Sequence, residues 1–275
     1  MTQTATLARV PQISILVPTF EPDPAHLRAA LDALFRQHSQ DWHVLVHDDA
    51  SRTDVESIIA PYRASDRFTY IRSESRLGIA GNWNASLAHA KSPFVQYLFQ
   101  YDVWHEQYLE RALKAMTEGV GMVVTAHKYQ IEGTMRFEKD TNAWYRDVER
   151  VRSHWLANKQ NGTELLSKWL EQGLHPNVIG EPSFVMCRRE VMEAAGKFDA
   201  SLPQGLDLDM WTRILPLTQV AYVKEDGGVF RVHSKGASAM NKEAGAGLLD
   251  RLTILHKLTR HSDGTIKKEA RAAFA

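Results

Sequence analysis

The sequence predicts an α/β domain built on a mostly parallel sheet. Short apolar runs alternate with segments of helical spacing, and these runs lie at residues 13–17, 43–46, 68–71, 94–99 and 121–125. Strands that alternate with helices pair in parallel, because each helix returns the chain to the starting edge of the sheet. The 275 residues, of which 44% are hydrophobic, suffice for one large core, with or without an appended subdomain.

The intervening helices are expected at residues 25–37, around residue 54, up to residue 90 and at residues 106–116. The first of them has a clear start, because Asp23 can cap its N-terminus and Pro24 suits the first helical position. This alternation predicts that residues 1–127 form the nucleotide-binding half of the domain.

Beyond residue 128 the pattern becomes mixed, and we expect a second half of the same domain at residues 128–240 and a helical tail at 241–275. Helices are predicted at residues 163–170, 188–195, 206–215 and 248–258, and strands at 183–187, 220–223 and 229–232. Residues 140–155 are polar and aromatic without an assignable period.

Composition narrows the classes of partner. Lys+Arg and Asp+Glu both number 33, so no charge excess points to nucleic acid or to a membrane surface. The single cysteine, Cys187, excludes an internal disulfide framework and suits a reducing cytosol. No run approaches the roughly 20 apolar residues of a membrane span. We expect a cytoplasmic protein whose membrane contact, at the inner face, is at most peripheral.

Acidic residues follow two of the predicted strands: Asp48 and Asp49 after the second, and Asp102 after the fourth. The carboxyl ends of parallel strands share the edge where ligands bind. A carboxylate there can hold a divalent cation or a ribose, and a turn cap is the alternative. Arg76, in the loop after the third strand, offers a fork of donors to a diphosphate, or is simply solvated.

Asp207 is the candidate general base of the second half. Asp209 and Arg213 are four residues apart and can pair along a helix, whereas Asp207 has no basic residue three or four positions later. His233, at a strand end, suits a metal or phosphate site or an ordinary surface position. No G-x-G-x-x-G follows the first strand and no Walker A sequence is present, which disfavours hydride transfer and ATP hydrolysis.

Together these motifs resemble the inverting glycosyltransferases of family 2, which have the GT-A fold. The resemblance covers most of residues 12–240, and the order of the motifs makes it specific. They are ISILVPT at 13–19, DDAS at 48–51, RLGIAGNWN at 76–84, QYD at 100–102, GEPS at 180–183, GKFD at 196–199, LDLDMW at 206–211 and RVH at 231–233.

The resemblance implies transfer of a sugar, with inversion, from a UDP- or dTDP-linked donor to a hydroxyl of a glycan or lipid-linked acceptor, as in surface polysaccharide synthesis. Asp207 would take the proton of that hydroxyl. Mg²⁺ or Mn²⁺, bound by Asp102 and His233, would bridge the diphosphate. The nucleotide sugar would be held by Thr19, Asp48, Asp49, Arg76 and Tyr101. The second half would bind the acceptor, with tryptophans either stacking on sugar rings or packing in the core, namely Trp144, Trp155, Trp169 and Trp211.

The sequence departs from the family at the central strand end. The family usually has two or three acids there, whereas Gln100 and Tyr101 leave only Asp102. A tyrosine, with a pKa near 10, cannot replace a carboxylate as the ligand of a hard cation. The cation site survives if the metal acid corresponds to Asp102 and is impaired if it corresponds to Tyr101. The acid expected before Asp207 is also absent, since Leu206 stands there.

Alternatives therefore stay open. The first is a sugar-nucleotide-binding protein without turnover, and the second is a nucleotidyltransferase, for which no glycine-rich phosphate loop is found. Peripheral contact with anionic lipid could use Lys267, Lys268 and Arg271, although a solvated helix face is the simpler explanation. A homo-oligomer is also left open.

Overall fold

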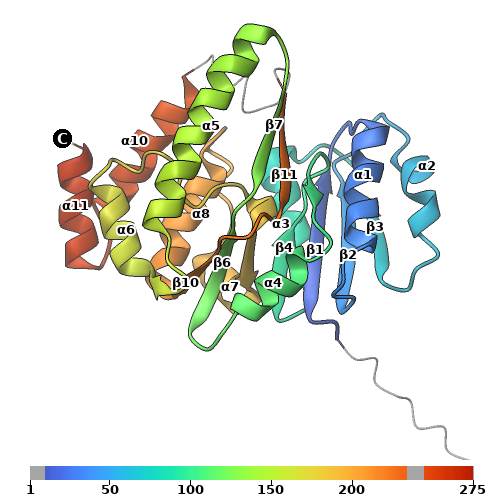
Figure 1. The fold of residues 1–275 in the computed structure, drawn as a ribbon, viewed down its shortest axis with the longest axis horizontal. Helices are drawn as coiled ribbons and strands as arrows, with labels where there is room; N and C mark the ends of the chain where they lie inside the picture. Colours follow the sequence, from blue (N-terminus) through green and yellow to red (C-terminus); the bar gives the residue numbers. More distant parts are fainter. Residues whose placement is uncertain (1–9, 234–244, 275) are drawn as a thin grey trace, which may run out of the picture.

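A computed structural model describes residues 10–233 and 245–274, and its centre is an eight-stranded sheet (Figure 1). The strand order is β3-β2-β1-β4-β9-β6-β10-β8. The strands are β1 (Ile13–Thr19), β2 (Trp42–Asp48), β3 (Phe68–Arg72), β4 (Phe94–Tyr97), β6 (Val120–Thr125), β8 (Gln160–Asn161), β9 (Val185–Arg188) and β10 (Gln219–Val223). Only β9 and β8 run antiparallel to their neighbours. The predicted α/β class is confirmed.

A second, three-stranded sheet joins distant parts of the chain. It consists of β5 (Val103–Trp104), β11 (Gly228–His233) and β7 (Lys128–Glu132), with β11 in the middle. Because β5 starts directly after Asp102, this sheet brings β11 to the predicted site, and the backbone N–H of Arg231 donates to Asp102 Oδ1 at 3.1 Å.

Helices cover both faces of the large sheet (Figure 1). One face packs against α1 (Pro24–Phe35), α2 (Val55–Ile59) and α4 (Tyr108–Ala115). The hydrophobic cluster on the other face includes residues of α3 (Gly78–Ala88), α6 (Gly162–Leu170), α7 (Arg189–Ala195), α8 (Leu206–Ile214), α10 (Ala246–Leu258) and α11 (Gly264–Phe274). Strand β1 shows why both faces are covered, since Ile15 and Val17 enter the first cluster and Leu16 the second.

The unassigned residues 140–155 form most of α5 (Met135–Trp155), the longest helix described. Thr134 caps it by accepting a hydrogen bond from the backbone N–H of Phe137 at 3.3 Å. Its buried positions are Thr141, Val148 and Arg152, so the face that packs inward mixes apolar, polar and charged residues. A helix that buries an arginine lacks the hydrophobic period by which helices are recognised.

The C-terminal helices belong to the main core. Ile254 of α10 and Ile266 of α11 are buried in the cluster that also contains Leu16. Asp250 of α10 is buried, and its Oδ2 accepts hydrogen bonds from the backbone N–H groups of Gln204 and Gly205, each at 2.7 Å. Gly205 immediately precedes α8, so α10 fixes the start of that helix. The proposed division at residues 127/128 and 240/241 stays a prediction.

None of the helices in the described ranges is both long and apolar enough to cross a membrane.

Replacing Asp250 with alanine should lower the free energy of unfolding by about 2–4 kcal/mol, because two buried backbone N–H groups lose a charged acceptor. Urea denaturation measures this change. The matched control is Asp140→Ala, at a carboxylate that is 70% exposed, which should change stability by less than about 0.5 kcal/mol. Equal effects of the two substitutions would contradict the role given to Asp250.

Candidate nucleotide-sugar site

The carboxyl edge of the parallel strands gathers most of the predicted site residues. Thr19 ends β1 and Asp48 ends β2, and the two are paired in register. Arg76 lies in the loop between β3 and α3, and Tyr101 and Asp102 lie in the loop between β4 and β5. The edge predicted from the alternation of elements is therefore the place where these residues meet.

The two aspartates after β2 are engaged inside the protein. Asp48 is fully buried, and its Oδ2 accepts from the Tyr70 hydroxyl at 3.0 Å. Asp49 is 2% exposed, and its two oxygens accept from the backbone N–H groups of Leu77 and Gly78 at the start of α3. The Thr19 hydroxyl is likewise turned inward, to Val17 O. These contacts fix the loops at the ends of β1 and β2, and direct contact of the three residues with a nucleotide stays a prediction.

Arg76 and Tyr101 lie closer to solvent. The Arg76 guanidinium is exposed and lies 4.2 Å from the centre of the Phe20 ring, just beyond β1. The Tyr101 hydroxyl accepts from Gln100 Nε2 at 2.6 Å. Burial raises the pKa of Tyr101, so this position carries a neutral phenol where an acid was expected.

Asp102 is 1% exposed and has one oxygen to spare. Oδ1 accepts from the Arg231 backbone, whereas Oδ2 has no hydrogen-bond partner among the described residues. Burial raises the pKa of Asp102 to about 8, against the effect of the neighbouring Ser183 hydroxyl. Within the same described part of the chain, Nε and Nη1 of Arg231 are also buried without partners. An unpartnered carboxylate oxygen beside unpartnered guanidinium N–H groups fits a cation together with a phosphate.

Two further observations bear on a metal. The described residues contain no group of three or more His, Cys, Asp or Glu side chains placed to hold an ion. The predicted ligand His233 ends β11, but its side chain lies outside what the structure describes.

Asp207 stands in the first turn of α8, half-buried and hydrogen-bonded. Asn177 Nδ2 donates to its Oδ2 at 2.9 Å. Burial raises the pKa of Asp207 to about 7, and the negative charge of Glu181 acts in the same direction. A carboxyl group with this pKa can accept a proton near neutrality.

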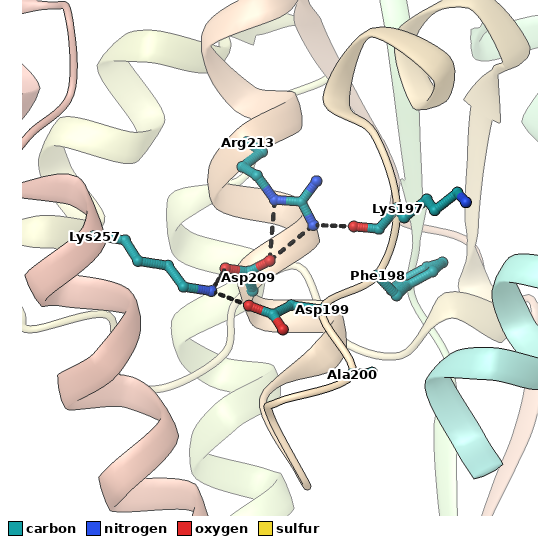
Figure 2. Close-up of a pocket in the computed structure, with 7 residues that line it drawn as sticks. All are labelled: Lys197, Phe198, Asp199, Ala200, Asp209, Arg213 and Lys257. Carbon is teal, nitrogen blue, oxygen red and sulfur yellow. Dashed lines mark hydrogen bonds and ion pairs between the residues drawn. The ribbon is translucent and has the colours of Figure 1, made fainter. Parts of the chain in front are cut away.

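Asp209 has a different environment (Figure 2). Its Oδ2 accepts from Arg213 Nη2 at 2.7 Å, as the four-residue spacing predicted, and its Oδ1 accepts from Lys257 at 3.0 Å. It lines a pocket between α8, α10 and the loop at Asp199. Two cations thus neutralise Asp209, and Asp207 is the better placed of the two to act as a base.

A short segment connects Asp207 to Asp102. Residues 177–183, which we call the bridging segment, begin at Asn177 beside Asp207 and end at Ser183 beside Asp102. Two indole N–H groups hold the backbone here: Trp169 donates to Pro176 O, just before the segment, at 2.7 Å, and Trp211 donates to Gly180 O, at its centre, at 2.8 Å.

Two of the four tryptophans considered for sugar stacking are core residues, since Trp169 is fully buried and Trp211 is 1% exposed. Trp155 is half-buried beneath Lys168, whereas Trp144 is 40% exposed beside His175.

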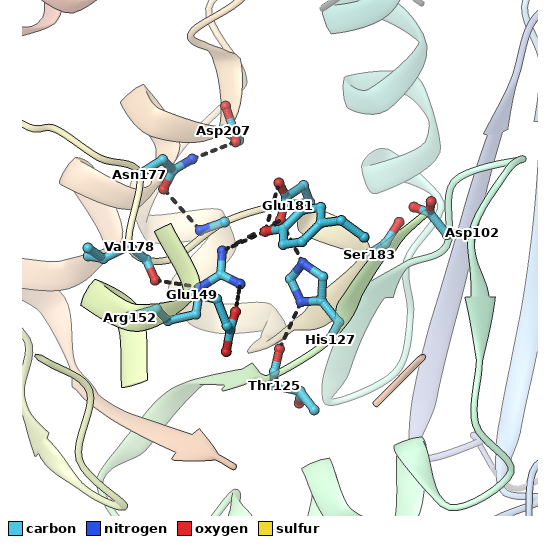
Figure 3. Close-up of polar contacts among 12 residues, drawn as sticks. Asp102, Thr125, His127, Glu149, Arg152, Asn177, Val178, Glu181, Ser183 and Asp207 are labelled. Carbon is cyan, nitrogen blue, oxygen red and sulfur yellow. Dashed lines mark hydrogen bonds and ion pairs between the residues drawn. The ribbon is translucent and has the colours of Figure 1, made fainter. Parts of the chain in front are cut away.

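The middle of the bridging segment carries Glu181, which sits in a buried charge cluster (Figure 3). Its Oε2 lies 2.9 Å from His127 Nε2, 3.2 Å from the Tyr129 hydroxyl and 3.7 Å from Arg152 Nη2. Burial opposes ionisation, but His127 and Arg152 prevail and lower the pKa of Glu181 to about 2. The other ring nitrogen of His127, Nδ1, lies 3.1 Å from Thr125 O, so both ring nitrogens face an oxygen atom.

Arg152 completes the cluster from α5. Its side chain is fully buried, and it donates to Val178 O at 3.0 Å, to Glu149 Oε2 at 3.0 Å and to the Tyr129 hydroxyl at 3.2 Å. Sequence reasoning gave no role to Glu181 or Arg152. The GEPS motif contained Glu181 among residues of the resemblance, and the three-residue spacing of Glu149 and Arg152 was a weak signal for a helix in the unassigned segment.

With this geometry in place, comparison with known proteins decides the family. A family model described as glycosyl transferase family 2 matches residues 14–193. The chain belongs to this family. The predicted resemblance is thereby confirmed.

Several known proteins are similar in sequence to this chain. An uncharacterized protein of Mycobacterium tuberculosis, MT1568, is 28% identical over 89% of this chain and 75% of its own length. The succinoglycan biosynthesis protein ExoW of Rhizobium meliloti is 34% identical over 38% of this chain and 34% of its own. An Escherichia coli UDP-Glc:alpha-D-GlcNAc-diphosphoundecaprenol beta-1,3-glucosyltransferase, WfgD, is 26% identical over 38% and 40%, respectively. The chain thus spans less than half of the latter two.

Solved structures share the fold. S. aureus TarS 1–349 in complex with UDP-GlcNAc superposes with a TM-score of 0.69 and 14% identity, over 96% of this chain and 70% of that one. The mannosyltransferase PcManGT of Pyrobaculum calidifontis, in complex with GDP-Man and Mn²⁺, gives 0.66 and 18%, over 97% and 70%. A longer TarS structure is covered to 42%.

Arg152→Met should destabilise the protein at pH 7 by about 3–5 kcal/mol, because Glu149 and Glu181 lose a buried counter-charge. The stabilisation of ionised Glu181 is complete above pH 4.5 and is lost as the pH falls through about 2. The Arg152→Met variant lacks most of this stabilisation. The free energies of unfolding of the variant and of the unaltered protein should therefore converge as the pH falls. Urea denaturation between pH 3 and 8 measures the gap. The control Arg146→Met, at an exposed position of α5, should show no such gap. A gap that stays constant with pH would contradict this account.

Proposed function

We propose that this protein is an inverting glycosyltransferase that moves a hexosyl group from a UDP- or dTDP-linked donor to a hydroxyl of a glycan or lipid-linked acceptor. The observation that carries the proposal is the placement of Asp207 and Asp102 at opposite ends of the bridging segment. The relatives named for succinoglycan synthesis and for glucosyl transfer support a role in surface polysaccharide assembly.

In this reaction Asp207 is the general base. It removes the proton of the acceptor hydroxyl as that oxygen attacks the anomeric carbon from the face opposite the leaving diphosphate, and a single displacement inverts the configuration. Asn177 holds the carboxylate in place through Oδ2. A pKa of about 7 leaves the group substantially ionised at neutral pH yet able to hold the proton.

The leaving group would be bound at the other end. Arg231 presents unpartnered Nε and Nη1 donors to the diphosphate, and Arg76 supplies an exposed guanidinium. The unpartnered Oδ2 of Asp102 fits a divalent cation, Mg²⁺ or Mn²⁺, with His233 as the second proposed ligand. When bound, such an ion neutralises charge on the nucleoside diphosphate.

Thr19, Asp48, Asp49 and Tyr101 are proposed to surround the nucleotide. Their position at the carboxyl ends of β1, β2 and β4 supports this proposal. The two aspartates also accept hydrogen bonds from within the protein, so they would shape the loops around the nucleotide as well. Peripheral contact of α11 with anionic lipid remains a proposal, supported by the exposure of Lys268 and Arg271.

A second candidate function is binding of a sugar nucleotide without turnover. The neutral phenol of Tyr101 in place of an acid favours it. Only the transferase forms product, and only in the transferase does substitution of Asp207 reduce product formation.

Calorimetric titration with UDP and with dTDP, each with Mn²⁺ and with a chelator, tests the donor site. We expect one nucleotide to bind, at least about tenfold more tightly with Mn²⁺, and Asp102→Ala to remove the metal effect. Asp140→Ala is the control and should bind as the unaltered protein does. Binding indifferent to metal would remove the cation from the proposal, and no binding of either nucleotide would overturn the proposed function.

Asp207→Asn should reduce transfer by at least about 10²-fold while leaving nucleotide binding within about twofold, because it removes the proton acceptor and keeps the shape. In the unaltered enzyme kcat/KM should rise with pH through about 7, as Asp207 loses its proton. Product formation across pH 5 to 9 in an acceptor screen measures both. Full activity of the variant would rule out Asp207 as the base.

A further inference from the structure

The bridging segment places one side chain where the transferred sugar must lie. In an inverting displacement the sugar ring sits between the leaving diphosphate and the attacking hydroxyl, which here means between Asp102 and Asp207. Glu181 occupies the middle of the segment that joins them, four residues after Asn177 and two before Ser183. Figure 3 shows Glu181 between Asp207 and Asp102.

Glu181 reaches the surface of the site, whereas its supports do not. Its side chain is 18% exposed, while those of His127 and Arg152 are fully buried. Three groups engage Oε2, but Oε1 has a single long contact, with the Tyr129 hydroxyl at 3.3 Å. A carboxylate oxygen can accept two hydrogen bonds, so Oε1 retains acceptor capacity on a side chain that is already fixed in position.

Tyr145 of α5 adds a second polar group at this place. Its ring stacks on Tyr129 at 3.8 Å between centroids and 19° between planes. The hydroxyl of Tyr129 contacts Glu181, so one stacked ring separates Tyr145 from that carboxylate, and burial raises the pKa of the Tyr145 phenol. The unpartnered, buried Oδ2 of Asp102 marks the same region as a place for a ligand.

We propose that Glu181, assisted by Tyr145, binds the hydroxyl groups of the transferred sugar and selects a neutral sugar over a uronic acid. This inference rests on the proposed glycosyl transfer and specifies its donor. A fixed carboxylate accepts hydrogen bonds from sugar hydroxyls, and the ionised Glu181 repels a carboxylate on the sugar.

Calorimetry with UDP, UDP-glucose and UDP-glucuronic acid tests the proposal, with the dTDP compounds used instead if dTDP is the nucleotide that binds. The unaltered protein should bind the glucose compound at least about tenfold more tightly than the glucuronic acid compound. Glu181→Gln should lower the ratio of these two affinities several-fold. The affinity of this variant for UDP itself should stay within about twofold of that of the unaltered protein.

The matched control is Glu149→Gln, which also removes a charge from Arg152 but lies on the other side of the guanidinium (Figure 3). It should leave the ratio of the two sugar nucleotides unchanged. Tyr145→Phe, which keeps the stacked ring, should weaken binding of the glucose compound several-fold without changing that of the nucleotide, and it tests the site even if Glu181→Gln fails to fold.

Equal binding of the two sugar nucleotides by the unaltered protein, or equal effects of the Glu181 and Glu149 substitutions, would overturn the inference and leave the proposed function standing. Absence of any nucleotide binding would overturn both.

Discussion

The site depends on the neutralisation of one buried cation. Arg152 has no access to solvent, and an unpaired guanidinium at such a position would cost several kcal/mol. Its counter-charges come from Glu149 on the same helix and from Glu181 on the bridging segment, and Val178 O of that segment takes a further N–H. The need to neutralise Arg152 of α5 therefore fixes the backbone of the bridging segment, which lies between Asp207 and Asp102.

The sheet supplies the other half of this arrangement. Parallel strands bring Thr19, Asp48 and Asp102 to one edge, and the small sheet adds Arg231 to the same edge through the bond of its backbone to Asp102. Asp207, at the other end of the site, is positioned by helices: it lies in α8, and Asp250 of α10 fixes the start of α8. Each end of the site is thus positioned by a rigid element, and the bridging segment sets the distance between the ends.

Most of the fold follows from local patterns, because alternating apolar runs and capped helices report on the residues that carry them. The edge position of Asp102 and the pairing of Asp209 with Arg213 are predictable for that reason. Helix α5 is not predictable in this way, because its inward face carries Arg152. The burial of Arg152 depends on Glu181, which lies 29 residues later in the chain. Trp211 similarly donates to a backbone carbonyl of the bridging segment, and Trp169 donates to the carbonyl of Pro176 just before it. Nothing local in the sequence distinguishes such a tryptophan from one that faces a ligand.

Strand β9 has a consequence for how the chain acquires its structure during synthesis. It lies between β4 and β6 and is antiparallel to both, although 59 residues separate the end of β6 at Thr125 from its own start at Val185. While the ribosome has made only the first half, β6 has neither β9 nor β10 beside it. The sheet can close only after Arg188 has emerged, so the first half of the chain does not mature as an independent unit on the ribosome.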